Sequence, residues 1–162
     1  MKAEYQDIFI IEGQGIAGDQ KSISLPFTHV SSRAIILRRK DGAILGALHR
    51  PNGKYALPGG AIDDGESAED ALQRELQEEG IRLIGSDERW RERLSVDYYD
   101  GYKELSLWYV FLVDDAETEM NEEILEFKWI RQEEDLWYPY VREKILLNLL
   151  QYVPDLVNIN PD

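Results

Sequence analysis

The sequence predicts an α+β or mixed α/β fold, in which helices pack against a sheet built from hairpins, and three observations support this prediction. Two Asp-Gly pairs, Asp41-Gly42 and Asp100-Gly101, stand between apolar or alternating runs. A segment from about Ala68 to Glu79 has the pattern of an amphipathic helix, and a second such segment runs from about Pro139 to Tyr152. Because there is no internal repeat or low-complexity linker, we expect one domain over residues 1–162.

The two Asp-Gly pairs predict β-hairpins, because these residues tolerate the positive φ angles of a tight turn. The first pair joins a strand over Arg33–Leu37 to one over Ile44–Leu48. The second joins Leu94–Tyr99 to Glu104–Val113, where apolar residues alternate with others. Three further strands are predicted from weaker patterns, at Ile8–Glu12, Ser22–Phe27 and Phe127–Ile130.

The two helices have recognisable ends. Ser67 is the expected N-cap of the first helix, with Asp70 three residues later in a variant of the capping box. Gly80 is placed to end that helix in a left-handed cap. The second helix has a proline in its first turn, where the missing N–H does no harm. We interpret its apolar stripe as core packing rather than a partner-binding groove; the stripe consists of Val141, Ile145, Leu149 and Tyr152.

Composition excludes several classes of function. The net charge of -14 would repel DNA, RNA and anionic membranes, whereas a small phosphorylated ligand is compatible with it if a divalent cation screens the repulsion. The absence of cysteine excludes disulfides and thiolate metal sites. The densest apolar stretch, Leu107–Val113, is far shorter than the ~20 residues that span a bilayer. We therefore expect a soluble, cytoplasmic protein that binds neither nucleic acid nor membranes, and a homodimer is left open.

Three carboxylates of the first helix predict a metal site. At about 100° per residue, Glu75, Glu78 and Glu79 fall on the side of the helix that also carries its alanines and leucines. Like charges three and four residues apart repel, and burial adds to that cost. A hard cation such as Mg²⁺, which prefers oxygen ligands, would offset both effects. The alternative is an acidic surface helix, but such a helix would place its glutamates opposite the leucines.

The residues before and within this helix resemble the Nudix box, G-x5-E-x7-R-E-U-x-E-E-x-G-U, where U is a bulky apolar residue. Gly60, Glu66 and the run Arg74–Glu79 match at every spacing, and Tyr55–Gly60 resembles the family's aromatic-x-Leu-Pro-Gly-Gly lead-in. One position departs from the pattern, because Gly80 follows Glu79 directly without the intervening residue. The resemblance implies an α/β/α sandwich around a mixed sheet.

The resemblance also implies an activity, which is magnesium-dependent hydrolysis of a diphosphate linkage in a nucleotide-type small molecule. By match to the box, the metal ligands would be Glu75, Glu78 and Glu79, together with the carbonyl of Gly59. Arg74 would orient the carboxylates, Glu66 would support the junction between loop and helix, and Mn²⁺ could replace Mg²⁺.

Residues outside the box complete the expected site. Many members of the family use a further glutamate from a loop as general base, and the segment Asn121-Glu122-Glu123 is the natural place for it. We favour Glu123, and Glu122 and Glu75 stay open as alternatives. Arg50 follows a predicted strand and precedes the glycine turn, so it is the first candidate for binding a substrate phosphate, and Arg38 is the second.

Two other functions fit the same resemblance less well. A ligand-sensing module without turnover would usually have lost glutamates of the box, and here all are present. An isomerase of prenyl diphosphates would require a catalytic cysteine, which the chain does not have. The sequence does not identify the substrate among nucleotide derivatives.

Overall fold

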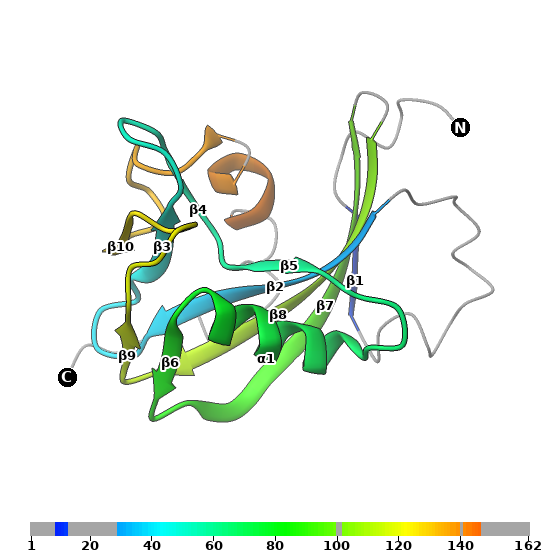
Figure 1. Ribbon diagram of the computed structural model, residues 1–162, viewed down its shortest axis with the longest axis horizontal. Helices are drawn as coiled ribbons and strands as arrows, with labels where there is room; N and C mark the ends of the chain where they lie inside the picture. The colour runs from blue at the N-terminus through cyan, green and yellow to red at the C-terminus, as the bar shows by residue number, and fades with distance from the viewer. Residues whose placement is uncertain (1–8, 13–28, 100–101, 140, 147–162) are drawn as a thin grey trace.

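The computed structural model describes residues 9–12, 29–99, 102–139 and 141–146 (Figure 1). Within these residues, eight strands form one sheet and two more form a small separate sheet. The central order is β1 (Phe9–Glu12), β7 (Asp87–Tyr99), β8 (Tyr102–Val113), β2 (His29–Arg38), β3 (Ile44–Leu48) and β10 (Glu126–Ile130). Two short strands join this path, with β4 (Tyr55–Ala56) on β3 and β5 (Gly59–Ala61) on β2. The small sheet pairs β6 (Ile81–Ile84) with β9 (Asp115–Thr118).

The sheet is mixed, as the sequence predicts. β2 pairs in parallel with β8 over the whole length of β2, whereas the other pairs of this sheet are antiparallel. β2 therefore lies at the centre, with neighbours on both sides and the short β5 paired to its first half. Residues 31–33 of β2 therefore pair with β5 on one side and with β8 on the other.

Both predicted hairpins are present. Leu37 pairs with Ile44 across the first, and the backbone N–H of Arg38 donates to the carbonyl of Ala43 at 2.8 Å. In the second, Tyr99 pairs with Tyr102, and the turn residues 100–101 lie outside the described part of the chain. The predicted strands at the N-terminus and at Phe127–Ile130 correspond to β1 and β10. The predicted strand Ser22–Phe27 lies outside the described residues.

The helix α1 (Ala68–Glu78) begins and ends as its sequence indicates. The Ser67 hydroxyl accepts a hydrogen bond from the backbone N–H of Asp70 at 3.1 Å. At the other end Gly80 takes a φ of 79°, the left-handed conformation that glycine adopts at little cost. Ala71, Leu72 and Leu76 are the buried residues of the helix.

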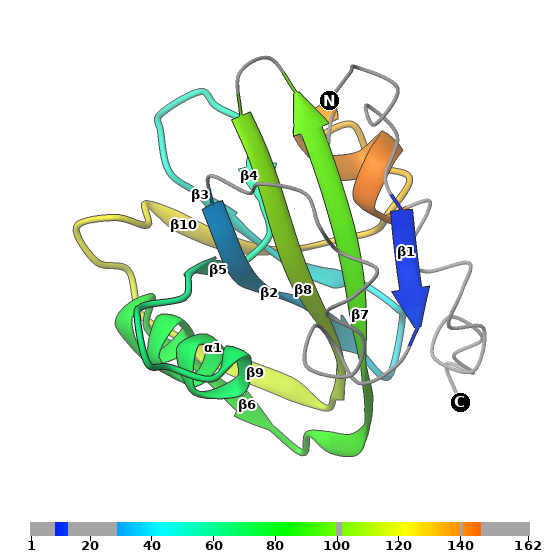
Figure 2. The same ribbon diagram turned by 90° about the vertical axis from the view of Figure 1, so that its right-hand side faces the viewer.

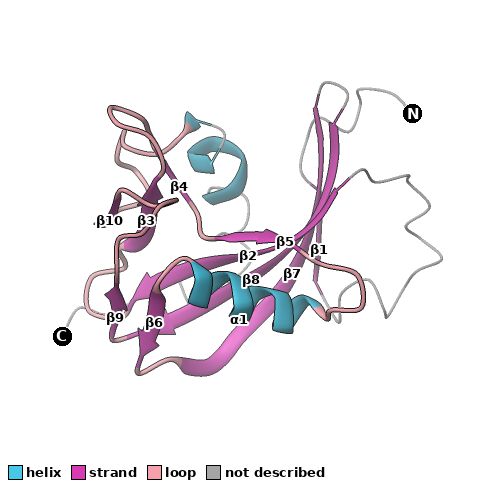
Figure 3. Cartoon of the chain, in the orientation of Figure 1, coloured by secondary structure: helices cyan, strands magenta, loops and turns pink. Residues whose placement is uncertain are grey.

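The core consists of two clusters of buried side chains, one on each face of the sheet, whose strands Figure 2 shows from the side of β7 and β8. On β2, Ala34 and Ile36 face the layer that α1 covers with Leu72 and Leu76. Ile35 and Leu37 face the other layer, which is completed by the helical segment η4 (Val141–Leu146) (Figure 3). The predicted sandwich of helix, mixed sheet and helix is therefore confirmed.

The second helix differs from its prediction. Its described part, η4, has π-type rather than α-type hydrogen bonding. Val141 and Ile145, two members of the predicted stripe, are buried in the core, so that part of the interpretation as core packing is confirmed. Leu149 and Tyr152 lie outside the described residues. No helix in the described ranges is both long enough and apolar enough to cross a membrane.

Candidate active site

The glycine turn before α1 is fastened to the middle of the sheet. The backbone N–H of Ala34 donates to the carbonyl of Pro58 at 3.0 Å, and Arg33 pairs with Gly59 between β2 and β5. Gly59 has a φ of 135°, and a Cβ added there would lie 2.6 Å from the Cα of Arg33. The position therefore requires glycine both for its conformation and for its close approach to β2.

The next glycine lies directly against a predicted metal ligand. A Cβ on Gly60 would lie 2.5 Å and 2.7 Å from the two carboxylate oxygens of Glu75. The Glu75 side chain is 16% exposed, so its carboxylate is largely enclosed between α1 and the glycine turn. The glycine turn thus leaves room for the Glu75 carboxylate, and a larger residue at position 60 would displace it.

Glu79 is the buried acid of this site. The residue is 4% exposed, and its Oε2 atom has no hydrogen-bond partner within the described structure. Burial raises the pKa of the carboxyl to about 8, and the charge of Glu75 acts in the same direction. A hydrogen bond from the backbone of Gly59 lowers the pKa and offsets part of this effect. A buried carboxylate with one oxygen unpartnered is unfavourable in itself, so the site is suited to a positive charge from outside the chain.

Arg74 joins the loop before α1 to the acids on the helix. Its guanidinium donates to both carboxylate oxygens of Glu66, at 2.7 Å and 3.0 Å, and to the carbonyl of Ala61 at 3.0 Å. Its Nη1 atom reaches Glu75 at 3.0 Å and Glu78 at 3.3 Å. This arrangement has the geometry expected of a residue that orients the carboxylates. The bonds from Arg74 lower the pKa of Glu66 to about 2, so Glu66 stays ionised while it supports the junction.

The three predicted carboxylates do not share one environment. Glu79 is buried and Glu75 is enclosed, whereas the Glu78 side chain is 57% exposed at the edge of the helix. In the part of the chain that is described, no three acidic or histidine side chains already stand close enough together to hold a metal ion. The Arg74 guanidinium forms ion pairs with both Glu75 and Glu78, at 3.0 Å and 3.3 Å.

The donor atoms nevertheless fit a hard divalent cation. Glu79 supplies a buried oxygen that no hydrogen bond satisfies, and Glu75 supplies a carboxylate whose position is set by Gly60. Mg²⁺ binds such oxygen ligands and needs few of them from the protein, because it keeps several of its waters. The fit therefore rests on two enclosed carboxylates beside the glycine turn, with Glu78 near the rim.

The loop that carries the proposed general base lies over the end of α1. Glu123 is one of the charges that raise the pKa of Glu79, so its carboxylate is within electrostatic reach of the buried acid. Gly80, which follows Glu79 directly, also lies against this loop. A Cβ on Gly80 would lie 2.6 Å from the carbonyl of Glu119, and the Glu119 N–H donates to the carbonyl of Gly80 at 2.9 Å.

The two arginines expected to bind phosphate differ in their surroundings. Arg50 is exposed, next to the turn in which the Gly53 N–H donates to the Arg50 carbonyl at 3.0 Å. Arg38 instead donates to both oxygens of Asp41, at 3.0 Å and 2.6 Å, and its guanidinium lies 4.6 Å from the ring centroid of Trp129. The structure therefore gives Arg38 a role in holding the first hairpin, which the sequence analysis did not anticipate.

Arg33 is a cation of the site that the sequence analysis missed. It lies half-buried on β2, opposite Gly59, and its charge lowers the pKa of Glu79. Its Nε donates to the hydroxyl of Ser31 at 3.2 Å, and that hydroxyl lies 3.0 Å from the hydroxyl of Ser106. The sequence did carry a signal, because Arg33 is the one charged residue in the run from Val30 to Leu37.

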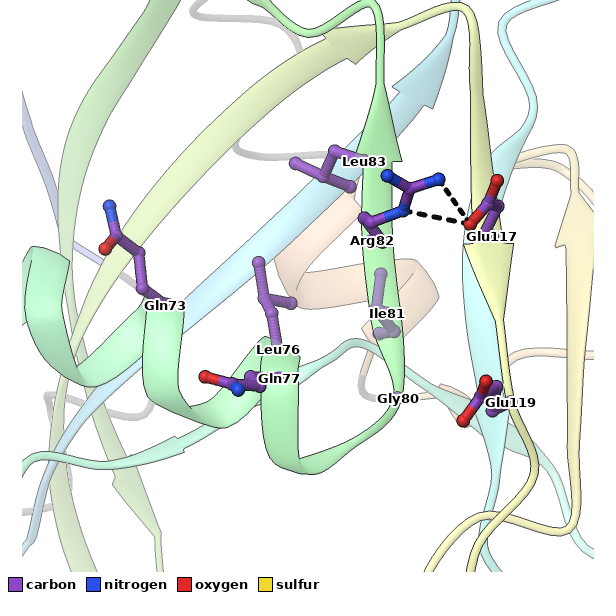
Figure 4. Close-up of a pocket in the computed structure, with 9 residues that line it drawn as sticks. All are labelled: Gln73, Leu76, Gln77, Gly80, Ile81, Arg82, Leu83, Glu117 and Glu119. Atoms are coloured by element: carbon purple, nitrogen blue, oxygen red, sulfur yellow. Dashed lines mark hydrogen bonds and ion pairs between the residues drawn. The ribbon is translucent and has the colours of Figure 1, made fainter.

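A groove of about 580 Å³ lies on another side of α1 and is separate from these acids (Figure 4). Gln73 and Gln77 line it from the helix, together with Arg82 and Glu117 from the small sheet. At about 100° per residue, Gln73 and Gln77 point nearly opposite to Glu75 on the helix. The candidate active site is therefore the glycine turn with the acids beside it, not this larger groove.

Comparisons with known proteins identify the family. The sequence profile of the family described as NUDIX domain matches residues 28–146. Nucleoside triphosphatase NudI of Salmonella arizonae is 34% identical over 95 residues, which cover 53% of this chain and 67% of the relative. The homologue from Salmonella newport is 33% identical over 51% of this chain and 64% of its own. The chain thus spans about two thirds of the length of these curated relatives.

Solved structures show the same fold. The MutT protein from Methanosarcina mazei Go1 is 23% identical with a TM-score of 0.53, over 74% of this chain and 91% of its own. The E. coli dihydroneopterin triphosphate pyrophosphohydrolase is 18% identical with a TM-score of 0.53, over 78% and 99%. At these identities the likeness concerns the fold alone.

Proposed function

The chain belongs to the Nudix family of pyrophosphohydrolases, and on that premise we propose that it uses Mg²⁺ to cleave a diphosphate linkage in a nucleoside diphosphate joined to another group. The observation that carries the proposal is the Glu79 carboxylate, which is buried beside Glu75 with one oxygen unpartnered. The charge of Arg33 stabilises the ionised carboxyl, but burial and the charge of Glu75 outweigh it, and a cation that also binds the diphosphate would offset the remaining cost. When bound, the cation would neutralise the diphosphate and make an attacking water more acidic.

The chain's own residues have distinct parts in this proposal. Glu75, Glu78 and Glu79 would hold the cation through their carboxylates, and the Gly59 carbonyl would add a neutral ligand. Arg74 keeps Glu75 in place through the 3.0 Å bond to its carboxylate. Because Glu66 holds Arg74 from the other side, the loop and the helix keep one relative position.

Proton transfer and substrate binding fall to residues outside the box. Water attacks a phosphorus atom, the bond from that phosphorus to the bridging oxygen breaks, and the proton released by the water passes to Glu123. Arg50, exposed beside the turn at residues 50–53, binds a non-bridging phosphate oxygen. Arg33 supplies a second positive charge near the glycine turn.

The similarity to proteins named nucleoside triphosphatase makes nucleoside triphosphates the first substrates to test. They contain the required diphosphate linkage and are small anions. In a protein of net charge -14, the local cations of the site would have to attract such an anion against the field of the whole molecule.

The experiment is a substrate panel assayed with Mg²⁺, with Mn²⁺ and with EDTA. The panel contains nucleoside triphosphates, dinucleoside polyphosphates, nucleotide sugars and ADP-ribose, and phosphate is measured with and without added phosphatase. Glu79→Gln and Glu123→Gln are assayed in parallel, because each removes one charge and little volume. We expect cation-dependent turnover that falls by about 100-fold or more in each variant.

The outcomes separate an enzyme from a binding module. Turnover that requires the cation and collapses in both variants supports the hydrolase. Binding of a panel compound without turnover, equal in the unsubstituted protein and in Glu123→Gln, would contradict the hydrolase and support a ligand-sensing role. Loss of turnover in Glu122→Gln instead of Glu123→Gln would show that the general base has been assigned to the wrong residue.

A further inference from the structure

The loop between β9 and β10 is tied to the body of the protein at both ends. At its start, the Glu119 N–H donates to the carbonyl of Gly80, directly after α1. At its end, the Leu125 N–H donates to the carbonyl of Leu48 on β3, at 2.8 Å. Between these two points the loop carries Glu123, which must reach the site from an exposed position.

Asn121 connects the middle of this loop to α1. Its Nδ2 donates to the carbonyl of Glu79 at 2.9 Å, and Glu79 is the C-cap of the helix. Its Oδ1 accepts from the backbone N–H of Glu123 at 2.8 Å and from that of Ile124 at 3.0 Å. A single side chain therefore bonds to the backbones of both the buried acid and the proposed general base.

The rest of the turn makes this link stiff. The backbone N–H of Asn121 donates to the carbonyl of Ile124 at 3.2 Å, so residues 121–124 form a hydrogen-bonded turn around the Asn121 side-chain amide. Ile124 is completely buried and anchors the turn in the protein, although Glu123 beside it is exposed. With the backbone held in this way, the side-chain torsions of Glu123 are the main freedom left to its carboxylate.

We propose that Asn121 is a positioning residue that sets the placement of Glu123 relative to Glu79, so that the two carboxylates act on one bound diphosphate. This inference rests on the proposed function. Its physical basis is the sensitivity of proton transfer to position, because a base displaced by about 1 Å can lower the rate by about 100-fold. An amide suits the task, since it donates to a carbonyl and accepts from two N–H groups without adding charge.

The test is a double-mutant cycle on the full-length chain, assayed with nucleoside triphosphates and Mg²⁺ or with the panel compound that the protein hydrolyses. Asn121→Ala alone should lower kcat by about 10- to 100-fold and change KM by less than about 3-fold. In the Glu123→Gln background the same substitution should change kcat by less than about 3-fold, because the base that it positions is already lost.

A matched background distinguishes positioning from general damage. Glu119→Gln neutralises another carboxylate of the same loop, and there Asn121→Ala should keep its full effect on kcat. If Asn121 had a structural role alone, Asn121→Ala would lower kcat by the same factor in the unsubstituted protein, in Glu123→Gln and in Glu119→Gln. That result would overturn the proposal. Thermal unfolding of each variant, with the melting temperature kept within a few degrees, shows that the comparison is made between folded proteins.

A second measurement does not depend on turnover. Amide hydrogen exchange at residues 123 and 124, followed by NMR in the cation-free protein, should accelerate by at least about 10-fold in Asn121→Ala and stay unchanged in Glu123→Gln. Unchanged exchange in Asn121→Ala would overturn the proposal even if the enzyme is active. Absence of turnover in the unsubstituted protein, with accelerated exchange in Asn121→Ala, would instead contradict the proposed function and leave Asn121 with a structural role only.

Discussion

At the scale of single residues, the site keeps a destabilising feature that the fold does not need. Glu79 is buried, and its pKa is raised to about 8 because the ionised form is poorly solvated there. The carboxylate also faces the charge of Glu75. Such features concentrate at functional sites, where stability is exchanged for a group poised to bind a ligand.

The neutral isostere at this position should therefore stabilise the cation-free protein. At pH 9 the Glu79 carboxyl is ionised, and Glu79→Gln removes a buried charge with an unpartnered oxygen. We expect the free energy of unfolding in EDTA to rise by about 1–3 kcal/mol, as measured by urea titration. The gain should shrink as the pH falls below about 8 and disappear towards pH 4.5, where the carboxyl is protonated in both the folded and the unfolded chain. A variant less stable than the parent at pH 9 would contradict this account of the site.

The contact between Gly60 and Glu75 makes a second prediction at this scale. A methyl group at residue 60 would overlap the Glu75 carboxylate, so Gly60→Ala should displace that ligand and lower kcat/KM by about 100-fold or more. The fold should survive, because the overlap is with the end of a side chain. Gly65→Ala is the control in the same loop, since its Cβ would meet nothing within 4 Å. That control should cost about 1–2 kcal/mol through its positive φ and leave turnover nearly unchanged. Equal losses of turnover in the two variants would contradict the prediction.

At the scale of elements, the start of α1 depends on an ion pair between Glu66 and Arg74. The pKa of Glu66 in the folded protein is about 2, below its ordinary value of 4.5, so the pair stabilises the protein fully above about pH 4.5. That stabilisation is lost as the pH falls towards 2. We expect Glu66→Gln to be less stable than the parent near pH 7, and the difference in unfolding free energy to narrow steadily between about pH 5 and pH 3. A difference independent of pH would mean that packing, not the charge of Glu66, holds the loop.

The elements that could be predicted are those whose signals are local. The Ser67 cap, the apolar spacing of Leu72 and Leu76 and the turn at Gly80 lie within a few residues of one another, and they determine α1. β4, β5, β6 and β9 were not predicted. They are two to four residues long and exist because of partners distant in sequence, as when Gly60 pairs with Ser32. No periodicity can appear in so short a segment.

The same distinction applies to the residues of the site. Glu75 and Glu79 could be proposed as site residues because their spacing on one helix is visible in the sequence. Arg33 was missed, because only the pairing of β5 with β2 brings it to the glycine turn. The bonds of Arg38 to Asp41 and its contact with Trp129 were not predicted for a similar reason, since they depend on the hairpin and on β10. Which cations lie near the acids is thus decided by strand order rather than by sequence neighbourhood.

At the scale of the whole molecule, the net charge of -14 acts against folding and against substrate approach. Repulsion between charges of one sign destabilises a compact state, and salt screens it over about 10 Å at 0.1 M ionic strength. Raising NaCl from about 20 to 200 mM should therefore increase the melting temperature by a few degrees. A protein dominated by stabilising surface ion pairs, such as that between Arg82 and Glu117, would respond in the opposite direction.

Specific binding of a cation should add to this general screening. At equal ionic strength, MgCl₂ should raise the melting temperature more than NaCl, because a ligand that binds only the folded state stabilises it by mass action. The excess should depend on Mg²⁺ concentration and disappear in Glu79→Gln, whereas the response to NaCl should persist in that variant, since one charge in a large excess is a small change. Neutralising a distant surface acid, as in Glu133→Gln, should leave the excess intact. If Mg²⁺ stabilised the parent and Glu79→Gln equally, the cation would act on the surface charge of the molecule as a whole, and the assignment of Glu79 as a ligand would be wrong.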